Sequence, residues 1–145
     1  MSELIGVIGA GTMGNGIAQT AAGAGFDVVI CDVNTEFVER GLANIGKSLD
    51  RFVKKETMTE AQKTEILGRI TPTTSLDDVK DCSLIVEAAS ENFEVKKYIF
   101  EQLDSVTKAD AILSSNTSSI SITKIAATTN RPDKVIGMHF FNPVP

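Results

Sequence analysis

The sequence contains too little cysteine and histidine for several common kinds of site. Its 145 residues include two cysteines, Cys31 and Cys82, and one histidine, His139. Without a CxxC pair or a second histidine, neither a disulfide framework nor a zinc site of Cys and His ligands is expected, and we predict no metal. Each cysteine lies within an apolar run, which predicts a buried, reduced thiol.

Long apolar runs and an excess of basic residues are also missing. No apolar run approaches the ~18 residues that a membrane-spanning helix needs, and residues 1–3 lack the basic start of a signal peptide. Acidic residues outnumber basic ones by 19 to 14, so the net charge is −5. Because nucleic acids and anionic membranes select basic surfaces, we expect no nucleic-acid or membrane partner and a cytoplasmic location.

The chain does have the composition of a globular domain. Apolar residues make up 42% of it, enough for a hydrophobic core. Short apolar runs, which predict buried strands, alternate with longer segments of helical periodicity. The expected strands are 4–8, 27–31, 70–74, 84–88, 112–115 and 135–139, and the expected helices are 13–24, about 38–52, 59–69, 95–106 and 122–128.

This alternation predicts an α/β fold. Parallel strands joined by right-handed helical crossovers give a doubly wound (Rossmann-type), mostly parallel sheet with helices on both faces. Two helices in succession separate the second and third strands, so we expect a long helical insertion after the second strand.

A GxGxxG motif follows the first predicted strand and opens the first predicted helix. The first glycine permits a tight turn, the second lets the backbone approach a pyrophosphate, and the third lets helix and strand pack closely. The helix N-terminus offers unpaired N–H groups to phosphates. A glycine-rich turn without a ligand is the alternative, but the strand–turn–helix context favours dinucleotide binding. The motif comprises Gly9, Ala10, Gly11, Thr12, Met13 and Gly14.

Asp32 stands at the end of the second predicted strand. In a dinucleotide-binding fold, an acidic residue at this place binds the ribose hydroxyls of the adenosine. A 2′-phosphate would meet the negative charge of Asp32, and no arginine occurs in residues 33–39 to offset it. The predicted cofactor is therefore NAD rather than NADP.

Three polar segments follow later predicted strands: 87–92 (EAASEN), 114–119 (SSNTSS) and 139–142 (HFFN). Ligands of a doubly wound sheet bind beyond the carboxyl ends of the strands, so these segments are expected to meet at the cofactor. A lone histidine is more often structural than catalytic, but His139 would stand among hydroxyls and amides there. Imidazole suits removal of a hydroxyl proton as hydride leaves carbon, which favours an alcohol–ketone dehydrogenase.

Longer segments resemble a known family. VIGAGTMGNGIA, IVEAASEN, SNTSSISIT and RPDKVIGMHFFNPVP are similar to the N-terminal portion of the 3-hydroxyacyl-CoA dehydrogenases, above all the bacterial 3-hydroxybutyryl-CoA branch. The resemblance implies NAD-dependent interconversion of (3S)-3-hydroxyacyl-CoA and 3-oxoacyl-CoA. It implies 3-hydroxybutyryl-CoA and acetoacetyl-CoA as the substrate pair.

The same resemblance assigns roles to single residues. It makes His139 the catalytic acid or base, and it makes Ser118 and Asn142 the residues that hold the substrate oxygen and the nicotinamide end of NAD. Glu91 and Lys96 match cofactor-contacting positions in addition to the glycine motif and Asp32.

Two further residues match coenzyme A contacts. Ser48 and Lys55 lie seven residues apart on the predicted long helix, which would place them on one face. A lysine at this place could meet a phosphate of CoA.

The family pattern continues past residue 145. In the family a glutamate about a dozen residues beyond the histidine pairs with it, and a C-terminal helical domain shapes the acyl pocket and forms a homodimer. We interpret residues 1–145 as the NAD-binding domain without that C-terminal domain. We expect this chain to bind NAD but to turn over poorly, because losing the carboxylate of a catalytic triad costs about 10⁴-fold in a different enzyme class.

Two other functions stay open on the sequence. The chain could be a regulatory module that senses NAD without chemistry, although His139, Ser118 and Asn142 together argue against this. It could also belong to a dehydrogenase of another hydroxy acid or of a nucleotide sugar, against which Ser48 and Lys55 discriminate only weakly.

Overall fold

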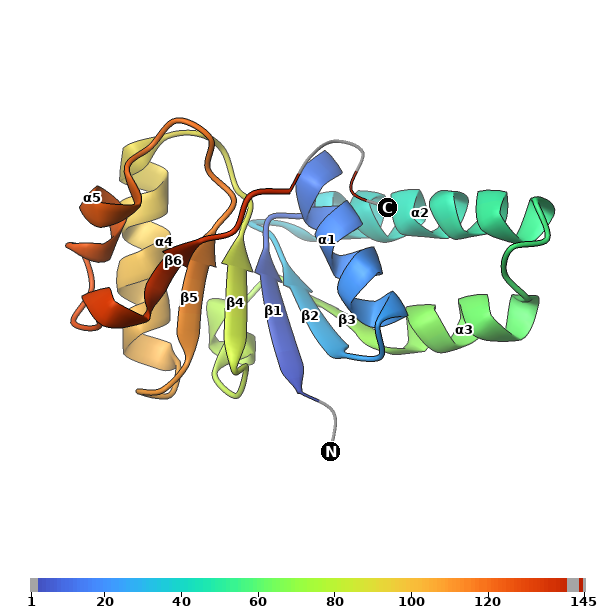
Figure 1. The fold of residues 1–145 in the computed structure, drawn as a ribbon, viewed down its shortest axis with the longest axis horizontal. Helices are drawn as coiled ribbons and strands as arrows, with labels where there is room; N and C mark the ends of the chain where they lie inside the picture. The colour runs from blue at the N-terminus through green and yellow to red at the C-terminus, as the bar shows by residue number, and fades with distance from the viewer. Residues whose placement is uncertain (1–2, 141–143, 145) are drawn as a thin grey trace.

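One parallel sheet with the strand order β3-β2-β1-β4-β5-β6 organises the molecule (Figure 1). The coordinates are a computed structural model that describes residues 3–140 and 144. Strand order reverses between β1 and β4, which places a ligand crevice at the carboxyl ends of these two strands. The strands are β1 (Leu4–Ile8), β2 (Asp27–Cys31), β3 (Ile70–Thr73), β4 (Leu84–Glu87), β5 (Ile112–Ser115) and β6 (Val135–Gly137).

Helices cover both faces of this sheet. Figure 1 shows α1 (Thr12–Gly23), α2 (Thr35–Lys54) and α3 (Glu60–Gly68) on one side, with α4 (Phe93–Val106) and α5 (Ile122–Ala126) on the other. Two short 3₁₀ turns, η1 (Leu76–Val79) and η2 (Pro132–Lys134), complete the described elements. The sequence pattern did not predict these two turns.

The core consists of two apolar layers because successive side chains of a strand point to opposite faces. In β2, Val28 and Ile30 pack in the layer with α1–α3, whereas Val29 and Cys31 pack in the layer with α4 and α5. The strands are therefore apolar on both faces, as central parallel strands are. Polar side chains stand at the carboxyl ends of β4 and β5, which end with Glu87 and Ser115.

The predicted fold class is confirmed, including the long helical insertion after β2. Asn34 caps α2 by accepting from the N–H of Phe37 at 2.9 Å. The capping box predicted from Thr59 and Gln62 opens α3, with hydrogen bonds of 2.9 and 3.1 Å. Within the described residues the sheet is wholly parallel rather than mostly parallel.

The last strand is shorter than predicted. β6 ends at Gly137 and not at His139, because the chain leaves the sheet there: the N–H of Phe140 donates to the side chain of Asn116 at 2.8 Å. The segment between β6 and Phe140 runs across the carboxyl ends of the strands toward α1 (Figure 1). Among the described residues, no helix is long and apolar enough to cross a membrane.

Candidate cofactor and catalytic site

The glycine motif forms a turn that side chains would block. Gly9 has φ +108°, and a Cβ there would lie 2.7 Å from the carbonyl oxygen of Ala88. A Cβ on Gly14 would lie 1.8 Å from the carbonyl oxygen of Gly9. Glycine is therefore required at both positions, at Gly9 by its backbone conformation and at Gly14 by the contact between α1 and the turn.

The middle glycine of the motif faces open space. A Cβ on Gly11 would meet nothing within 4 Å, and Gly11 is the N-cap of α1 without a side-chain hydrogen bond to cap it. The first N–H groups of a helix have no intrahelical partner, so they are available to an anion. The space over Gly11 and the N-terminus of α1 thus fit the pyrophosphate of a dinucleotide.

Asp32 follows β2 beside this turn. Its Oδ2 accepts from the N–H of Ala10 at 2.8 Å, and its Oδ1 accepts from the N–H of Val33 at 2.7 Å. These bonds fix the carboxylate at the edge of the crevice and tie the end of β2 to the glycine turn. Each carboxylate oxygen keeps a further lone pair for a ribose hydroxyl.

A cleft of about 1060 Å³ extends from the glycine turn toward η1 and α4. Asp32 and Asp77 line it, and the described lining residues include no lysine or arginine. Aromatic and aliphatic side chains form much of its wall, with Val33, Phe37, Val95 and Tyr98 at least partly exposed. This wall suits an adenosine, and its acidic side chains would repel a 2′-phosphate.

The thiol of Cys31 also lines this cleft. Burial, with smaller effects from Asp32 and Asp78, raises its pKa to about 11. Burial likewise raises the pKa of Cys82 to about 12. Both thiols are buried and unpaired with one another, as predicted, and both stay protonated at neutral pH. Neither is therefore a nucleophile.

A second pocket of about 320 Å³ adjoins the large cleft, with which it shares Met13, Ala88 and Ala89 as lining residues. Glu91, Asn116, Ser118, His139 and Phe140 complete its lining. Three residues that the sequence analysis singled out, Glu91, Ser118 and His139, therefore meet in one pocket at the end of the cofactor cleft. Asn142 lies outside the described residues.

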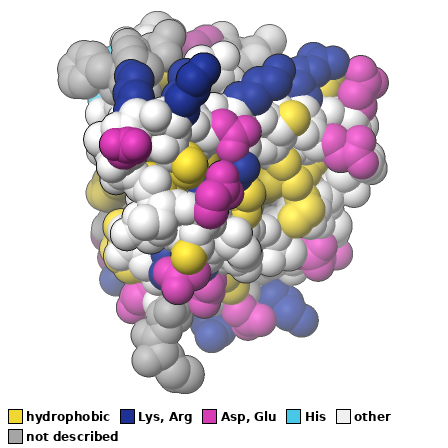
Figure 2. Space-filling view, turned by 90° about the vertical axis from the view of Figure 1, so that its right-hand side faces the viewer, with side chains coloured by type: hydrophobic (Ala, Val, Ile, Leu, Met, Phe, Trp, Pro, Cys, Tyr) yellow, Lys and Arg dark blue, Asp and Glu magenta, His cyan; other side chains and the backbone are white. Residues whose placement is uncertain are grey.

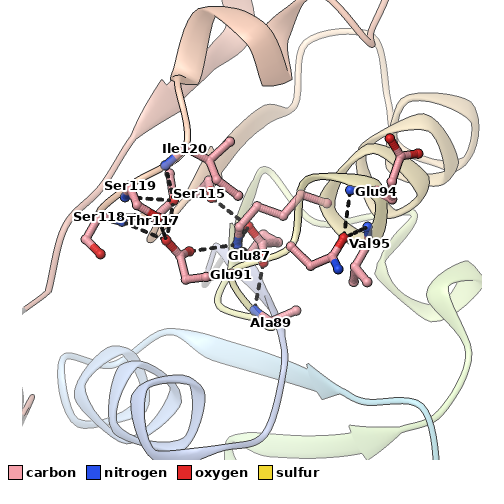
Figure 3. A network of polar contacts seen from close by, with 12 residues as sticks. Glu87, Ala89, Glu91, Glu94, Val95, Ser115, Thr117, Ser118, Ser119 and Ile120 are labelled. Atoms are coloured by element: carbon pink, nitrogen blue, oxygen red, sulfur yellow. Dashed lines mark hydrogen bonds and ion pairs between the residues drawn. The ribbon is translucent and has the colours of Figure 1, made fainter.

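Glu91 organises the loop that carries Ser118. Its Oε2 accepts from the hydroxyls of Thr117 (2.8 Å) and Ser119 (2.6 Å) and from the N–H of Ser118 (3.3 Å). Figure 3 shows the Glu91 side chain directed at this loop. Burial alone would raise its pKa, but the hydrogen bonds from Ser119 and Thr117 and the charge of Lys96 lower it to about 2. Glu91 is therefore anionic at any physiological pH.

Lys96 is fully buried, and its ammonium faces two carboxylates. The distances are 2.8 Å to both oxygens of Glu87 and 3.3 Å to Oε1 of Glu91. The sequence analysis placed Lys96 among residues that contact the cofactor. In this structure it lies behind Glu91, seen from the pocket, since only Glu91 of the two lines the pocket.

Sequence reasoning missed Glu87 as a residue of the site. Glu87 is the last residue of β4, has no exposed surface and pairs in register with Ser115 of β5. A signal was present: a glutamate closes an apolar strand at the predicted cofactor edge, and a lysine follows within the next helix. A buried carboxylate needs such a partner.

The two predicted CoA contacts lie in different surroundings. The hydroxyl of Ser48 is buried between α1 and α2, where it accepts from Nε2 of Gln19 at 3.0 Å. Lys55 is exposed and is the C-cap residue just beyond α2. The seven-residue spacing predicted that they share one helical face, but in the structure Ser48 is buried and Lys55 is exposed.

A glycine turn at a helix N-terminus, an acidic residue after β2 and a crevice where strand order reverses define a dinucleotide-binding domain. Comparison with known proteins agrees. The NAD-binding domain model of the 3-hydroxyacyl-CoA dehydrogenases matches residues 4–145. The chain belongs to this family and corresponds to its NAD-binding domain.

Named relatives narrow the comparison. The chain is 54% identical over 141 residues to a 3-hydroxybutyryl-CoA dehydrogenase of Bradyrhizobium diazoefficiens, covering 97% of this chain and 48% of that protein. It is 50% identical to one from Clostridioides difficile, covering 96% of this chain and 50% of the relative. The crystal structure of (S)-3-hydroxybutyryl-CoA dehydrogenase from Ralstonia eutropha superposes with a TM-score of 0.97 at 51% identity, over 100% of this chain and 51% of that one. The chain thus spans about half the length of the relatives it matches.

Proposed function

We propose that this chain is the cofactor-binding half of an enzyme that interconverts (3S)-3-hydroxybutyryl-CoA, or a related 3-hydroxyacyl-CoA, and the 3-oxoacyl-CoA. The observation that carries the proposal is the small pocket in which His139 and Ser118 stand at the end of the cofactor cleft. The relatives named 3-hydroxybutyryl-CoA dehydrogenase support the choice of substrate.

The residues of the pocket would divide the work as follows. The N-terminus of α1 at Gly11 would hold the pyrophosphate of NAD and Asp32 would hold its ribose, and NAD would supply the hydride acceptor. His139 removes the proton of the substrate hydroxyl and returns it in the reducing direction. Ser118 donates a hydrogen bond to the same oxygen. The thioester is untouched, so the reaction needs no nucleophile.

Recognition of CoA would rest on α2 and its end. Lys47, Arg51, Lys54 and Lys55 are exposed, and Figure 2 shows Lys and Arg side chains gathered along the upper edge of the face at the α2–α3 end. Lys55 would meet a CoA phosphate, and Ser48 would contact the same ligand after release from Gln19. Asn142 would hold the nicotinamide end together with Ser118.

The remaining parts of the proposal concern the assembled protein. The family's C-terminal helical domain would complete the acyl pocket and form a homodimer. A reducing compartment such as the cytoplasm suits two buried, protonated thiols that form no disulfide.

The test is an assay of the gene product that carries this chain, following NADH oxidation with acetoacetyl-CoA. We expect turnover that His139→Gln lowers by about 10²- to 10⁴-fold, the usual contribution of a general acid or base. The affinity for NADH should stay within about twofold, because imidazole loss removes no phosphate or ribose contact. Turnover of a hydroxy acid that carries no CoA would show that the substrate is not an acyl-CoA. NADH binding without turnover of any oxo acid would favour an NAD sensor.

A further inference from the structure

Glu87 has no role in the reaction proposed above, yet its carboxylate is among the most completely buried polar groups of the described residues. It lies on the α4 face of the sheet at the carboxyl end of β4. Its Oε1 accepts from the hydroxyl of Ser115 at 2.6 Å, and its Oε2 accepts from the N–H of Ala89 at 2.7 Å. These contacts fix its orientation at the point where β4 enters the loop that leads to Glu91.

The buried ammonium of Lys96 is fully occupied by carboxylates. It has three N–H donors, and three carboxylate oxygens lie within 3.3 Å of it, two from Glu87 and one from Glu91. Any direct contact with NAD would require Lys96 to give up one of these partners. Its geometry is that of a connector between two carboxylates.

The two oxygens of Glu91 serve different partners. Oε1 faces Lys96, whereas Oε2 receives all three donors from the loop at 117–119. Figure 3 shows these contacts running from Glu87 through Glu91 to the loop. The position of the loop therefore depends on the position of Lys96, and that of Lys96 depends on Glu87.

We propose that Glu87 is a positioning residue: it fixes Lys96, which orients Glu91 so that Glu91 holds the Ser118 loop in place for the nicotinamide end of the cofactor. This inference rests on the proposed placement of the nicotinamide end at the Ser118 pocket. Without the charge of Glu87, Lys96 would have a single carboxylate partner and would be drawn toward Glu91. Glu91 would then turn away from the loop.

The experiment compares two ligands on this chain by isothermal titration. NADH would occupy both ends of the cleft, whereas ADP-ribose, which lacks the nicotinamide, would occupy only the glycine and Asp32 end. Glu87→Gln should weaken NADH binding about tenfold, the size of one charge-assisted hydrogen bond. ADP-ribose binding should change by less than about twofold, because no contact at the glycine turn is altered.

A second variant guards against loss of folding, since removing one partner of a buried ion pair is strongly destabilising. Glu87→Gln combined with Lys96→Met removes both charges, which proteins often tolerate. It should show the same selective loss of NADH binding. Leu49→Ala is the matched control: it opens a cavity in the core layer of α2 and should leave the ratio of the two affinities unchanged.

Three results would overturn the proposal. Equal weakening of NADH and ADP-ribose in the folded variants would make Glu87 purely structural, and unchanged NADH affinity in both variants would remove it from the site. Wild-type chain that binds ADP-ribose and NADH equally tightly would show that the nicotinamide end makes no contact here. That last result would count against the proposed function as well, which the first two would leave intact.

Discussion

The two ends of the cofactor cleft are built from different materials. At the end proposed for the adenosine and the pyrophosphate, a glycine turn and the N-terminus of α1 present backbone, and the Asp32 carboxylate bonds to the turn at Ala10. The end proposed for the nicotinamide depends on the charged side chains of Glu87, Lys96 and Glu91, and Glu91 accepts hydrogen bonds from the uncharged loop at 117–119. The first end requires that Gly9 and Gly14 carry no side chain, whereas the second depends on how several side chains are oriented.

This difference predicts that the two ends fail in different ways. A change at the adenosine end should weaken every ligand that contains ADP-ribose. A change at the nicotinamide end should weaken NADH alone. The ratio of the NADH and ADP-ribose affinities therefore reports which end a substitution has damaged.

The largest effect is expected from Gly14→Ala. Its Cβ would lie 1.8 Å from the carbonyl oxygen of Gly9, so either the turn or α1 must move. Binding of both NADH and ADP-ribose should fall by more than about 100-fold, since the phosphate site itself is displaced, and the protein should unfold at lower temperature. Calorimetric titration and thermal unfolding would measure the two effects.

Two other glycines serve as controls for that variant. Gly46→Ala on α2 meets nothing within 4 Å and should bind both ligands normally. Gly11→Ala also meets open space and should fold normally, yet weaken both ligands if the pyrophosphate lies over Gly11. Normal binding by Gly14→Ala would show that the turn is not the phosphate site.

Asp32→Ala should have the next largest effect. Losing charge-assisted hydrogen bonds to the ribose costs about 1.5–3 kcal/mol, or roughly 10- to 100-fold in affinity. NADH and ADP-ribose should weaken equally, because both carry the adenosine ribose. Asp32→Asn, which keeps an acceptor oxygen for the N–H of Ala10, should lose less. A selective loss of NADH would mean that the ribose lies elsewhere.

The smallest effect is expected from Glu91→Gln, on the stability of the fold at acid pH. Its pKa is lowered from 4.5 to about 2 in the folded chain, so its ionised form stabilises the fold above pH 4.5. That contribution is lost as the pH falls from 4.5 toward 2, because protonation then favours the unfolded state. Urea unfolding across this range should show a shallower loss of stability in Glu91→Gln than in wild type.

Glu94→Gln is the matched control, since Glu94 is an exposed carboxylate on α4 whose side chain is outside the network around Glu91. It should follow the wild-type acid curve. If Glu91→Gln also follows that curve, the contacts of Glu91 with Thr117, Ser119 and Lys96 do not stabilise the fold.

Much of the fold could be predicted from local pattern. The predicted strands at 4–8 and 27–31 agree with β1 and β2 at both ends. Each is a short apolar run, and the glycine motif between them fixes where the first strand ends and the helix begins. The capping box at Thr59 located α3 for the same reason, since the two hydrogen bonds involve residues only three apart. β6 was extended too far, because the side chain of Asn116 takes the N–H of Phe140 away from the sheet.

The candidate site divides in the same way. The sequence by itself determined the glycine turn and the position of Asp32 beside it, and it predicted NAD as the cofactor, because these features lie within or beside a short motif. Only the tertiary structure decided that Lys96 is buried behind Glu91 and that Glu87 holds it. Lys96 lies five positions from Glu91 and nine from Glu87, and both glutamates accept from serines 28 positions away, Ser119 and Ser115. The sequence pattern alone does not show which of its charged residues the folded chain buries against one another.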